Sequence, residues 1–327
     1  MLAKFDYIRP NTVKEAIHFL ADENTVAHAG GTDLLGCLRE HIFEAKTVVS
    51  LSRLRELQGI QKTKDGGLRI GALTTLTEIG EDQLVRETWP GLARAALEVA
   101  SPQLRNQGTI GGNLCQKPRC WYYRGEFQCL RKGGNECFAE HGENVLHCIF
   151  GGENCFIVHP SDTAPALAAL EASVHTEGPK GQRTLPVEGF HVPPRDDFTR
   201  ETVLEPGEIV TEIVLPPPPV GLRSSYRKVR ARRSWDFALA GVALAIVLEG
   251  DRVSRARVFL SGAAPVPWRS KEVEEIITGK PLTQEIIKSA SLAVVKGARP
   301  LEQNGYKVPL FRSVMEEELQ SVLHPAK

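Results

Sequence analysis

The sequence has little of what a membrane protein or a nucleic-acid-binding protein needs. Its longest apolar stretch, residues 238–248, is far shorter than the roughly 20 residues that cross a bilayer. Its first residues lack the apolar core of a signal peptide. The Lys and Arg residues (40) balance the Asp and Glu residues (40), so no overall field attracts nucleic acid or an anionic membrane. The basic run at residues 223–233 alternates as an edge strand does. We therefore expect a globular cytoplasmic protein with no membrane span and no nucleic-acid partner.

The two commonest nucleotide-binding fingerprints, G-x-G-x-x-G and the Walker loop, are also absent. Two other glycine pairs are present, in the loops AGGTDLL (residues 29–35) and TIGGNL (residues 109–114). Backbone N–H groups of glycines between a strand and a helix can approach a phosphate closely, although one such pair is more often a tight turn. Two pairs are more informative, because a diphosphate needs donors that converge from several segments.

Cysteine is scarce outside one segment, since six of the seven cysteines lie between residues 115 and 155. A reducing compartment disfavours disulfides, so this crowding indicates a metal site. Thiolates are the usual ligands of iron–sulfur clusters and structural zinc, and four must converge on one centre. Neither a C-x-x-C pair nor the ferredoxin run is present, so spacing alone leaves iron–sulfur, zinc and a segment without metal as alternatives.

The first half of the chain has the pattern of an α+β protein. A capping-box spacing at Thr12 and Glu15 begins a predicted helix, and a small alternating unit continues with a strand at 26–29, a helix at 33–41 and a strand at 47–49. Turn residues predict a hairpin around 65–67, and apolar spacing predicts a helix over 89–99. The cysteine-rich segment has neither apolar period and is predicted to be an inserted loop.

The second half is divided by four consecutive prolines, residues 216–219, which form a stiff linker. A hairpin around 177–181 and a strand at 209–215 precede it. Beyond it the pattern predicts three strands and then three helices. The strands are expected at 224–229, 238–248 and 256–260, and the helices at 270–278, 283–295 and 310–323.

Four segments together resemble the FAD-binding subunit of molybdenum hydroxylases. They are AGGTDLL, SPQLRNQGTIGGNL (101–114), HPSDTAPAL (159–167) and YRKVRARRSWDFALAGVA (226–243), in the order of the family. That family includes xanthine dehydrogenase, carbon monoxide dehydrogenase and 4-hydroxybenzoyl-CoA reductase. The resemblance spans nearly the whole chain. It implies a PCMH-type FAD-binding region in two subdomains, residues 1–57 and 58–218 with a cysteine-rich insert at 115–156, followed by a C-terminal α+β domain, residues 219–327.

The resemblance implies FAD as a cofactor and places two groups of residues around its pyrophosphate and ribityl chain. Asp162 and Lys228 would be further polar contacts. Without the resemblance, Asp162 would be interpreted as a helix or turn cap and Lys228 as a solvated lysine on an edge strand. Cys115 follows the second glycine pair and is expected beside the flavin. The implied FAD-binding residues are Ala29, Gly30, Gly31, Thr32, Asp33, Leu34, Thr109, Gly111, Gly112, Asn113, Cys115, Asp162 and Lys228.

Most flavin subunits of this family have no cysteine-rich insert, but the 4-hydroxybenzoyl-CoA reductase branch has one that holds a 4Fe–4S cluster. LCQKPRC, QCLRKGGNEC and ENCFIVHPSDTAPAL are similar to the start, middle and end of that insert. The resemblance implies four ligands, with Cys148 in reserve because the stretch after the third ligand is longer here. Cys37 lies in a predicted helix and is expected to be a small core residue. The implied ligands are Cys120, Cys129, Cys137 and Cys155.

As a family member, the chain would be an oxidoreductase subunit that transfers electrons without transforming the organic substrate itself. A large molybdopterin-binding subunit would hold the substrate, and a small subunit would carry two 2Fe–2S clusters. This chain would connect them through FAD, which exchanges one or two electrons, to an external carrier such as ferredoxin or NAD. Two alternatives are a stand-alone FAD-dependent oxidoreductase and a zinc-stabilised scaffold without redox activity.

Overall fold

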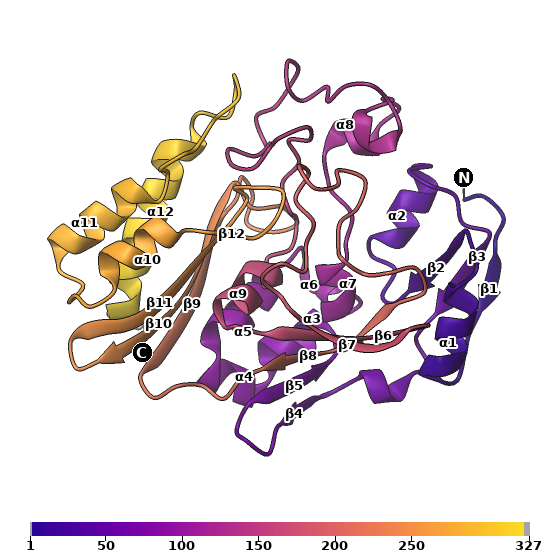
Figure 1. The fold of residues 1–327 in the computed structure, drawn as a ribbon, viewed down its shortest axis with the longest axis horizontal. Helices are drawn as coiled ribbons and strands as arrows, with labels where there is room; N and C mark the ends of the chain where they lie inside the picture. Colours follow the sequence, from indigo (N-terminus) through magenta and orange to yellow (C-terminus); the bar gives the residue numbers. More distant parts are fainter. Residues whose placement is uncertain (1, 324–327) are drawn as a thin grey trace.

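The computed structural model describes residues 2–323. Residue 1 and residues 324–327, at the ends of the first and third expected domains, lie outside the description. The described residues form three sheets with helices on their faces, placed one after another along the long axis of the molecule (Figure 1). The α+β class expected from the sequence is confirmed.

The N-terminal unit is a small parallel sheet with helices beside it. Its strands have the order β1–β3–β2, with β1 at Asp6–Ile8, β2 at Thr25–His28 and β3 at Thr47–Ser50. The Thr12 hydroxyl accepts the Glu15 N–H at the start of α1 (Val13–Leu20), and the Glu15 carboxylate accepts the N–H of Asn11. The expected N-cap is therefore present. The Glu15 carboxylate, however, accepts from the N–H of Asn11 and not from the N–H of Thr12, as it would in a capping box. The helix α2 (Leu34–Arg39) follows β2, and a 3₁₀ turn (Arg55–Leu57) ends the unit.

The middle unit is built on an antiparallel sheet with the order β4–β5–β8–β6–β7. The expected hairpins join β4 to β5 and β6 to β7, and the strand expected at 209–215 is β8. One buried core joins this sheet to its helices, with Trp89 and Phe190 among its largest side chains. The strands are β4 (Ile60–Lys62), β5 (Leu68–Gly71), β6 (Ser173–Gly178), β7 (Gly181–Pro186) and β8 (Ile209–Leu215).

Short helices cover the middle sheet. The helix expected at 89–99 is α5 (Pro90–Glu98), which confirms that prediction. The glycine-rich segment at 109–114 was expected to be a loop, and this prediction is wrong. The Thr109 hydroxyl accepts the Gly112 N–H, so the glycine pair lies inside a capped short helix. The other helices of this unit are α3 (Leu76–Glu81), α4 (Gln83–Thr88), α6 (Pro102–Arg105), α7 (Ile110–Leu114) and α9 (Thr163–Ala169).

The C-terminal unit is an antiparallel sheet with the order β12–β11–β10–β9. Its central strand β10 is buried on both faces, and successive strand residues point to opposite sides. Val242, Leu244 and Ile246 pack in the core shared with α10, α11 and α12, whereas Ala243 and Ala245 pack in the core of the middle unit. The elements are β9 (Leu222–Val229), β10 (Ala240–Glu249), β11 (Arg252–Ser261), β12 (Trp268–Arg269), α10 (Lys271–Ile277), α11 (Gln284–Ala293) and α12 (Lys307–Leu323).

Two boundaries of this unit differ from the sequence prediction by more than two residues. The strand expected at 256–260 is the second half of the longer β11. The last helix begins at Lys307, three residues before its expected start. Pro309 lies in its first turn, where a backbone N–H has no partner within the helix, so the proline is tolerated there.

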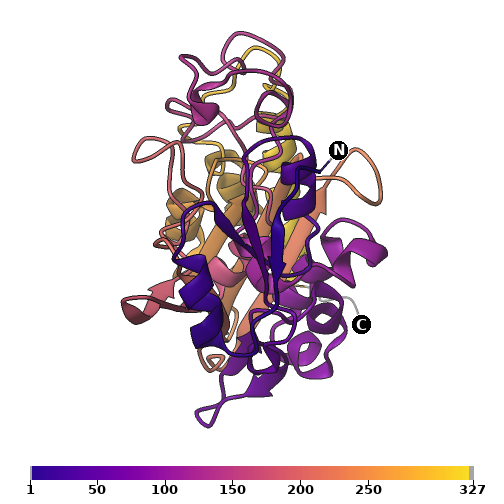
Figure 2. The same ribbon diagram turned by 90° about the vertical axis from the view of Figure 1, so that its right-hand side faces the viewer.

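The cysteine-rich insert forms the top of the molecule in Figure 1 and remains there in the turned view of Figure 2, behind the N-terminal unit. It contains α8 (Trp121–Arg124) and a 3₁₀ turn (Leu130–Lys132), and most of its remaining residues are irregular. This agrees with its lack of any apolar period. Among residues 2–323, no helix is both long and apolar enough to cross a bilayer.

Lys307 provides a pH-dependent test of this packing. It is fully buried, and its Nζ donates to the Gly262 carbonyl oxygen at 2.7 Å. Burial lowers the pKa of Lys307 from 10.5 to about 8. The unfolded chain therefore binds this proton more tightly, and the free energy of unfolding should rise as the pH increases from 8 to 10.5. Relative to Lys307→Met, we expect a rise of roughly 3 kcal/mol in chemical denaturation. Equal pH slopes in the two proteins would contradict this.

Candidate functional site

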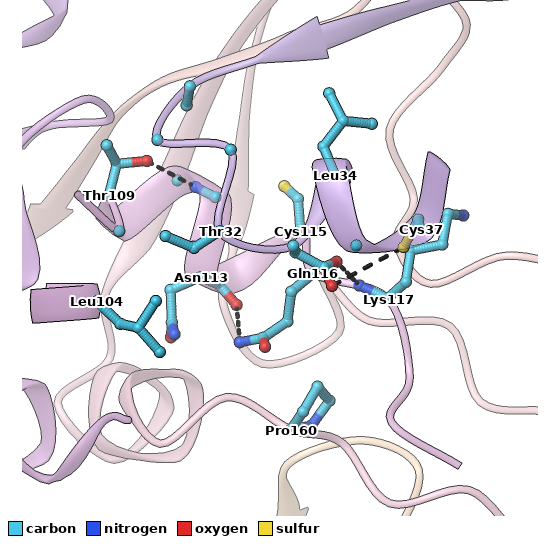
Figure 3. Close-up of a pocket in the computed structure, with 18 of the residues that line it drawn as sticks. Thr32, Leu34, Cys37, Leu104, Thr109, Asn113, Cys115, Gln116, Lys117 and Pro160 are labelled. Carbon is cyan, nitrogen blue, oxygen red and sulfur yellow. Dashed lines mark hydrogen bonds between the residues drawn. The ribbon is translucent and has the colours of Figure 1, made fainter. Parts of the chain in front are cut away.

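A cavity of about 640 Å³ lies where the N-terminal unit, the middle unit and the insert meet. Its walls come from β2, α2, α7, the segment before α9 and the loop between β9 and β10. Figure 3 shows Thr32, Leu34, Thr109, Asn113 and Cys115 gathered around this space, which we call the glycine-loop cavity. All the residues implied as FAD contacts line it: Ala29, Gly30, Gly31, Thr32, Asp33, Leu34, Thr109, Gly111, Gly112, Asn113, Cys115, Asp162 and Lys228.

The first glycine segment presents a series of backbone N–H groups to this cavity. The chain leaves β2 at His28 and turns at Gly31, whose φ of 72° lies in the left-handed region that favours glycine. Within the described part of the chain, the N–H groups of residues 30–34 donate to no backbone or side-chain acceptor. Successive N–H groups in such a turn form an anion-binding concavity. The segment is therefore suited to a phosphate.

The second glycine segment reaches the same cavity because the two backbones touch. Gly30 packs on Gln107 so closely that a Cβ atom would overlap the Gln107 carbonyl oxygen. The N–H of Gly111 donates to the carbonyl of Ala72 at 2.9 Å. Because Ala72 directly follows β5, this bond holds the start of α7 against the C-terminal end of that strand. Glycine at position 30 is what permits two segments far apart in the sequence to face one cavity.

The carboxylate of Asp33 binds the start of the insert. One oxygen, Oδ2, accepts the Lys117 N–H at 2.7 Å, and the other, Oδ1, accepts from Arg124 at 2.7 Å and from Arg119 at 2.9 Å. Asp33 therefore faces the cavity with a free N–H while its side chain is occupied by basic partners. Asp33 was expected at the site from the sequence, but its partners were not, because nothing local indicates that residues 84 to 91 positions away return to it.

Two polar groups around α9 are fixed by buried hydrogen bonds. The Asn113 Oδ1 accepts from the hydroxyls of Ser161 and Thr163 at 2.5 and 2.7 Å. This leaves the Nδ2 group of Asn113 as its donor. The residue thus carries an oriented amide at the wall of the cavity.

The second buried group is the pair of Asp162 and Lys228. The Lys228 ammonium donates to Asp162 at 2.7 Å, and the Tyr226 hydroxyl donates to the other oxygen at 2.7 Å. Burial raises the pKa of Asp162, against the opposing effect of both donors. Lys228 does lie on the edge strand β9, but its side chain is 1% exposed, so the alternative of a solvated lysine is wrong. Asp162 occupies the cap position of α9 without a capping bond from its side chain.

A second and much smaller cavity, of about 10 Å³, lies inside the insert, and we call it the cysteine cavity. Cys120, Cys129, Cys137 and Cys155 all line it. A hydrogen bond between the thiols of Cys155 and Cys137 lowers the pKa of Cys137 and raises that of Cys155. Burial raises the pKa of Cys120 to about 11. Between residues 2 and 323, no group of three or more His, Cys, Asp or Glu side chains lies close enough together to hold a single metal ion.

The remaining cysteines lie elsewhere. Cys148 lines a different cavity, beside Ile149 and Trp268, and is absent from the lining of the cysteine cavity. Cys115 borders the glycine-loop cavity, and Cys37 is fully buried in α2 as expected, although it borders that cavity too. His147 also lines the cysteine cavity. Its role could not be predicted from the sequence, because a lone histidine in an irregular segment carries no signal.

The glycine-loop cavity fits a flavin dinucleotide. The unpaired N–H groups of residues 30–34 suit a diphosphate, and apolar side chains such as Leu34, Leu76, Val99 and Leu104 suit planar rings. The loop between β9 and β10 adds Trp235 and Phe237, which the sequence analysis did not single out. A volume of about 640 Å³ lies within the usual range for cofactor sites.

Comparison with known proteins identifies the family. A family model described as the FAD binding domain in molybdopterin dehydrogenase matches residues 3–218, and the CO dehydrogenase flavoprotein C-terminal domain matches residues 224–321. The aldehyde oxidoreductase FAD-binding subunit PaoB of Escherichia coli (strain K12) is 36% identical over 96% of this chain and 97% of its own length. The carbon monoxide dehydrogenase medium chain of Hydrogenophaga pseudoflava is 30% identical over 91% of this chain and 88% of its own.

The fold agrees with these matches. A structure of carbon monoxide dehydrogenase from Hydrogenophaga pseudoflava superimposes with a TM-score of 0.78 and 27% identity, covering 99% of this chain and 98% of that one. The chain therefore belongs to the FAD-binding medium subunits of the xanthine dehydrogenase and carbon monoxide dehydrogenase family. It is an oxidoreductase subunit that binds FAD.

Gly30→Ala tests the contact that joins the two glycine segments. The added Cβ would overlap the Gln107 carbonyl oxygen, so one segment must move and the donors for the flavin must separate. We expect the purified variant to retain less than a tenth of the wild-type FAD, measured by flavin absorbance after gel filtration. Gly305→Ala is the control, because a Cβ there meets nothing within 4 Å. Full flavin content in Gly30→Ala would show that the close approach is not needed.

Proposed function

We propose that this chain passes electrons between FAD, a 4Fe–4S cluster and the 2Fe–2S clusters of a partner subunit in a molybdenum-dependent oxidoreductase. The observation that carries the proposal is that the four cysteines implied by the resemblance line one cavity. They come from well-separated positions in an irregular segment, so ordinary core packing gives no reason for them to converge. When bound, FAD supplies one- and two-electron transfer, and the cluster supplies one-electron transfer.

The proposed FAD-binding residues are those that line the glycine-loop cavity. Residues 29–34 would border the diphosphate, with the free N–H groups of residues 30–34 as its donors, and Thr109, Gly111, Gly112 and Asn113 would bind from the opposite segment. Cys115 would lie beside the flavin. Asp162 and Lys228 would act as a hydrogen-bonded pair at the border with the C-terminal sheet, so the charge of each is balanced before the cofactor binds.

The proposed cluster ligands are Cys120, Cys129, Cys137 and Cys155, as in the insert of 4-hydroxybenzoyl-CoA reductase. Cys148 was the reserve ligand, and its place in a different cavity supports leaving it out. The junction at Asp33 supports a functional link between the two cofactors. Arg124 belongs to α8, which begins directly after Cys120, and it binds the carboxylate of the first glycine segment. One ion cluster therefore connects the FAD segment to the cluster segment.

The proposed partners are a molybdopterin-binding large subunit and a small subunit with 2Fe–2S clusters. Relatives of similar length are named as medium chains or FAD-binding subunits, which supports such an assembly. The external electron carrier would be a ferredoxin, NAD or another acceptor. The proposed domains remain residues 1–57, 58–218 with the insert at 115–156, and 219–327. A cytoplasmic location is supported by the lack of any disulfide among the cysteines of residues 2–323, which is typical of a reducing compartment.

The composition of the purified protein tests this proposal. An anaerobic visible spectrum, with analysis of flavin, iron, sulfide and zinc, should show FAD together with about four irons and four sulfides per chain. Flavin with zinc or without metal would retain the electron-transfer subunit and exclude the cluster. Zinc without any flavin would favour a non-redox scaffold, and turnover of an organic substrate by the isolated monomer would favour a stand-alone FAD-dependent enzyme.

Two serine substitutions test the choice of ligands. Cys137→Ser should lose most of the iron and sulfide, because serine replaces a thiolate that the cluster needs. Cys148→Ser is the matched control: it changes another buried cysteine of the same insert and should keep about four irons per chain. Both variants should keep their FAD. Loss of iron in Cys148→Ser with retention in Cys137→Ser would reverse the assignment.

A further inference from the structure

We propose that His147 donates a hydrogen bond from Nε2–H to the sulfur of Cys120 and thereby raises the reduction potential of the cluster held there. The inference rests on the proposed cluster and adds a tuning residue to it. His147 would act through Cys120 rather than bind iron, so it is a positioning residue.

The geometry of His147 is the first support. Its Nε2 lies 3.2 Å from the Sγ of Cys120, and the residue lines the cysteine cavity with the four proposed ligands. The side chain is buried, and the ring packs edge-on against Trp121 with centroids 5.1 Å apart. These contacts leave the imidazole little freedom to turn away from the sulfur.

The backbone of His147 is fixed as well. Its N–H donates to the Asn144 carbonyl at 3.0 Å, and its own carbonyl accepts from the Asn304 amide at 3.0 Å. Asn304 is fully buried and also binds the carbonyl of Cys148. The turn that presents the histidine is therefore held by the C-terminal unit, far along the chain from the insert.

The direction of the hydrogen bond follows from the state of the Cys120 sulfur. The Nδ1 of His147 is buried and makes no well-aligned hydrogen bond to a described residue. A neutral imidazole carries its proton on one of its two nitrogens. A cysteine thiolate that binds iron has no proton and can only accept. The tautomer with Nε2–H therefore satisfies both groups.

Such a bond changes the redox equilibrium of the cluster. Reduction adds negative charge to the cluster and its sulfurs, so a donor to sulfur stabilises the reduced form more than the oxidised form. Backbone N–H groups of Tyr122 and Tyr123 also bind the Cys120 sulfur, but substitution does not remove them. His147 supplies a side-chain donor, which makes the effect testable by mutation.

The experiment compares three variants in the complex purified with its partner subunits. His147→Leu removes the donor, His147→Gln keeps an amide donor, and His141→Leu changes an exposed histidine of the same insert as the control.

Iron and sulfide are measured first, and the cluster is then titrated with EPR detection of its reduced state. We expect full iron content in all three variants. At a fixed potential, the ratio of reduced to oxidised cluster should fall about tenfold in His147→Leu, which is about 59 mV for one electron. It should recover in His147→Gln and stay unchanged in His141→Leu.

The remaining outcomes separate this inference from the proposed function. An intact cluster with the wild-type potential in His147→Leu would overturn the inference alone. Loss of iron from His147→Leu and His147→Gln alike would also overturn it, because the histidine would then be a ligand. A wild-type protein without iron would overturn the inference together with the cluster on which it rests.

Discussion

The arrangement of this protein depends on the contact between the backbone of Gly30 and that of Gln107. No residue with a side chain fits at position 30, because its Cβ would overlap a carbonyl oxygen. This contact brings the free N–H groups of residues 30–34 and the capped glycine helix α7 to one cavity. An isolated glycine pair is only a turn, and it is the meeting of two such segments from different units that builds a surface able to bind a dinucleotide.

The same region also connects the cavity to the insert and to the C-terminal sheet. Asp33 joins the first glycine segment to Arg124 and to Lys117 at the base of the insert, and Asp162 joins α9 to Lys228 of β9. Both junctions pair charges that burial would otherwise penalise. The proposed flavin site is thus joined to the insert by Asp33 and to the C-terminal sheet by Asp162 and Lys228. The insert is anchored although it has little regular structure of its own.

Much of the fold could be predicted from the sequence, because most helices, strands and turns are indicated by residues that are neighbours in the chain. Apolar periodicity located α5 and β8, and turn residues located the hairpins. It failed where a short element has no period, as in α7, whose helix depends on the Thr109 cap. At the site, the family resemblance named residues that line one cavity and cysteines that line another. It missed Arg119, Arg124 and His147, because their importance arises from contacts across long distances in the chain.

In the proposed function, one chain holds a flavin between the glycine segments and a 4Fe–4S cluster among the four cysteines of the insert. Anomalous diffraction at the iron edge, from crystals of the complex grown without oxygen, tests it most directly. We expect an iron signal enclosed by Cys120, Cys129, Cys137 and Cys155, with flavin density along residues 29–34 and 109–113. A zinc signal at these cysteines, an iron signal that involves Cys148, or flavin bound elsewhere would contradict it.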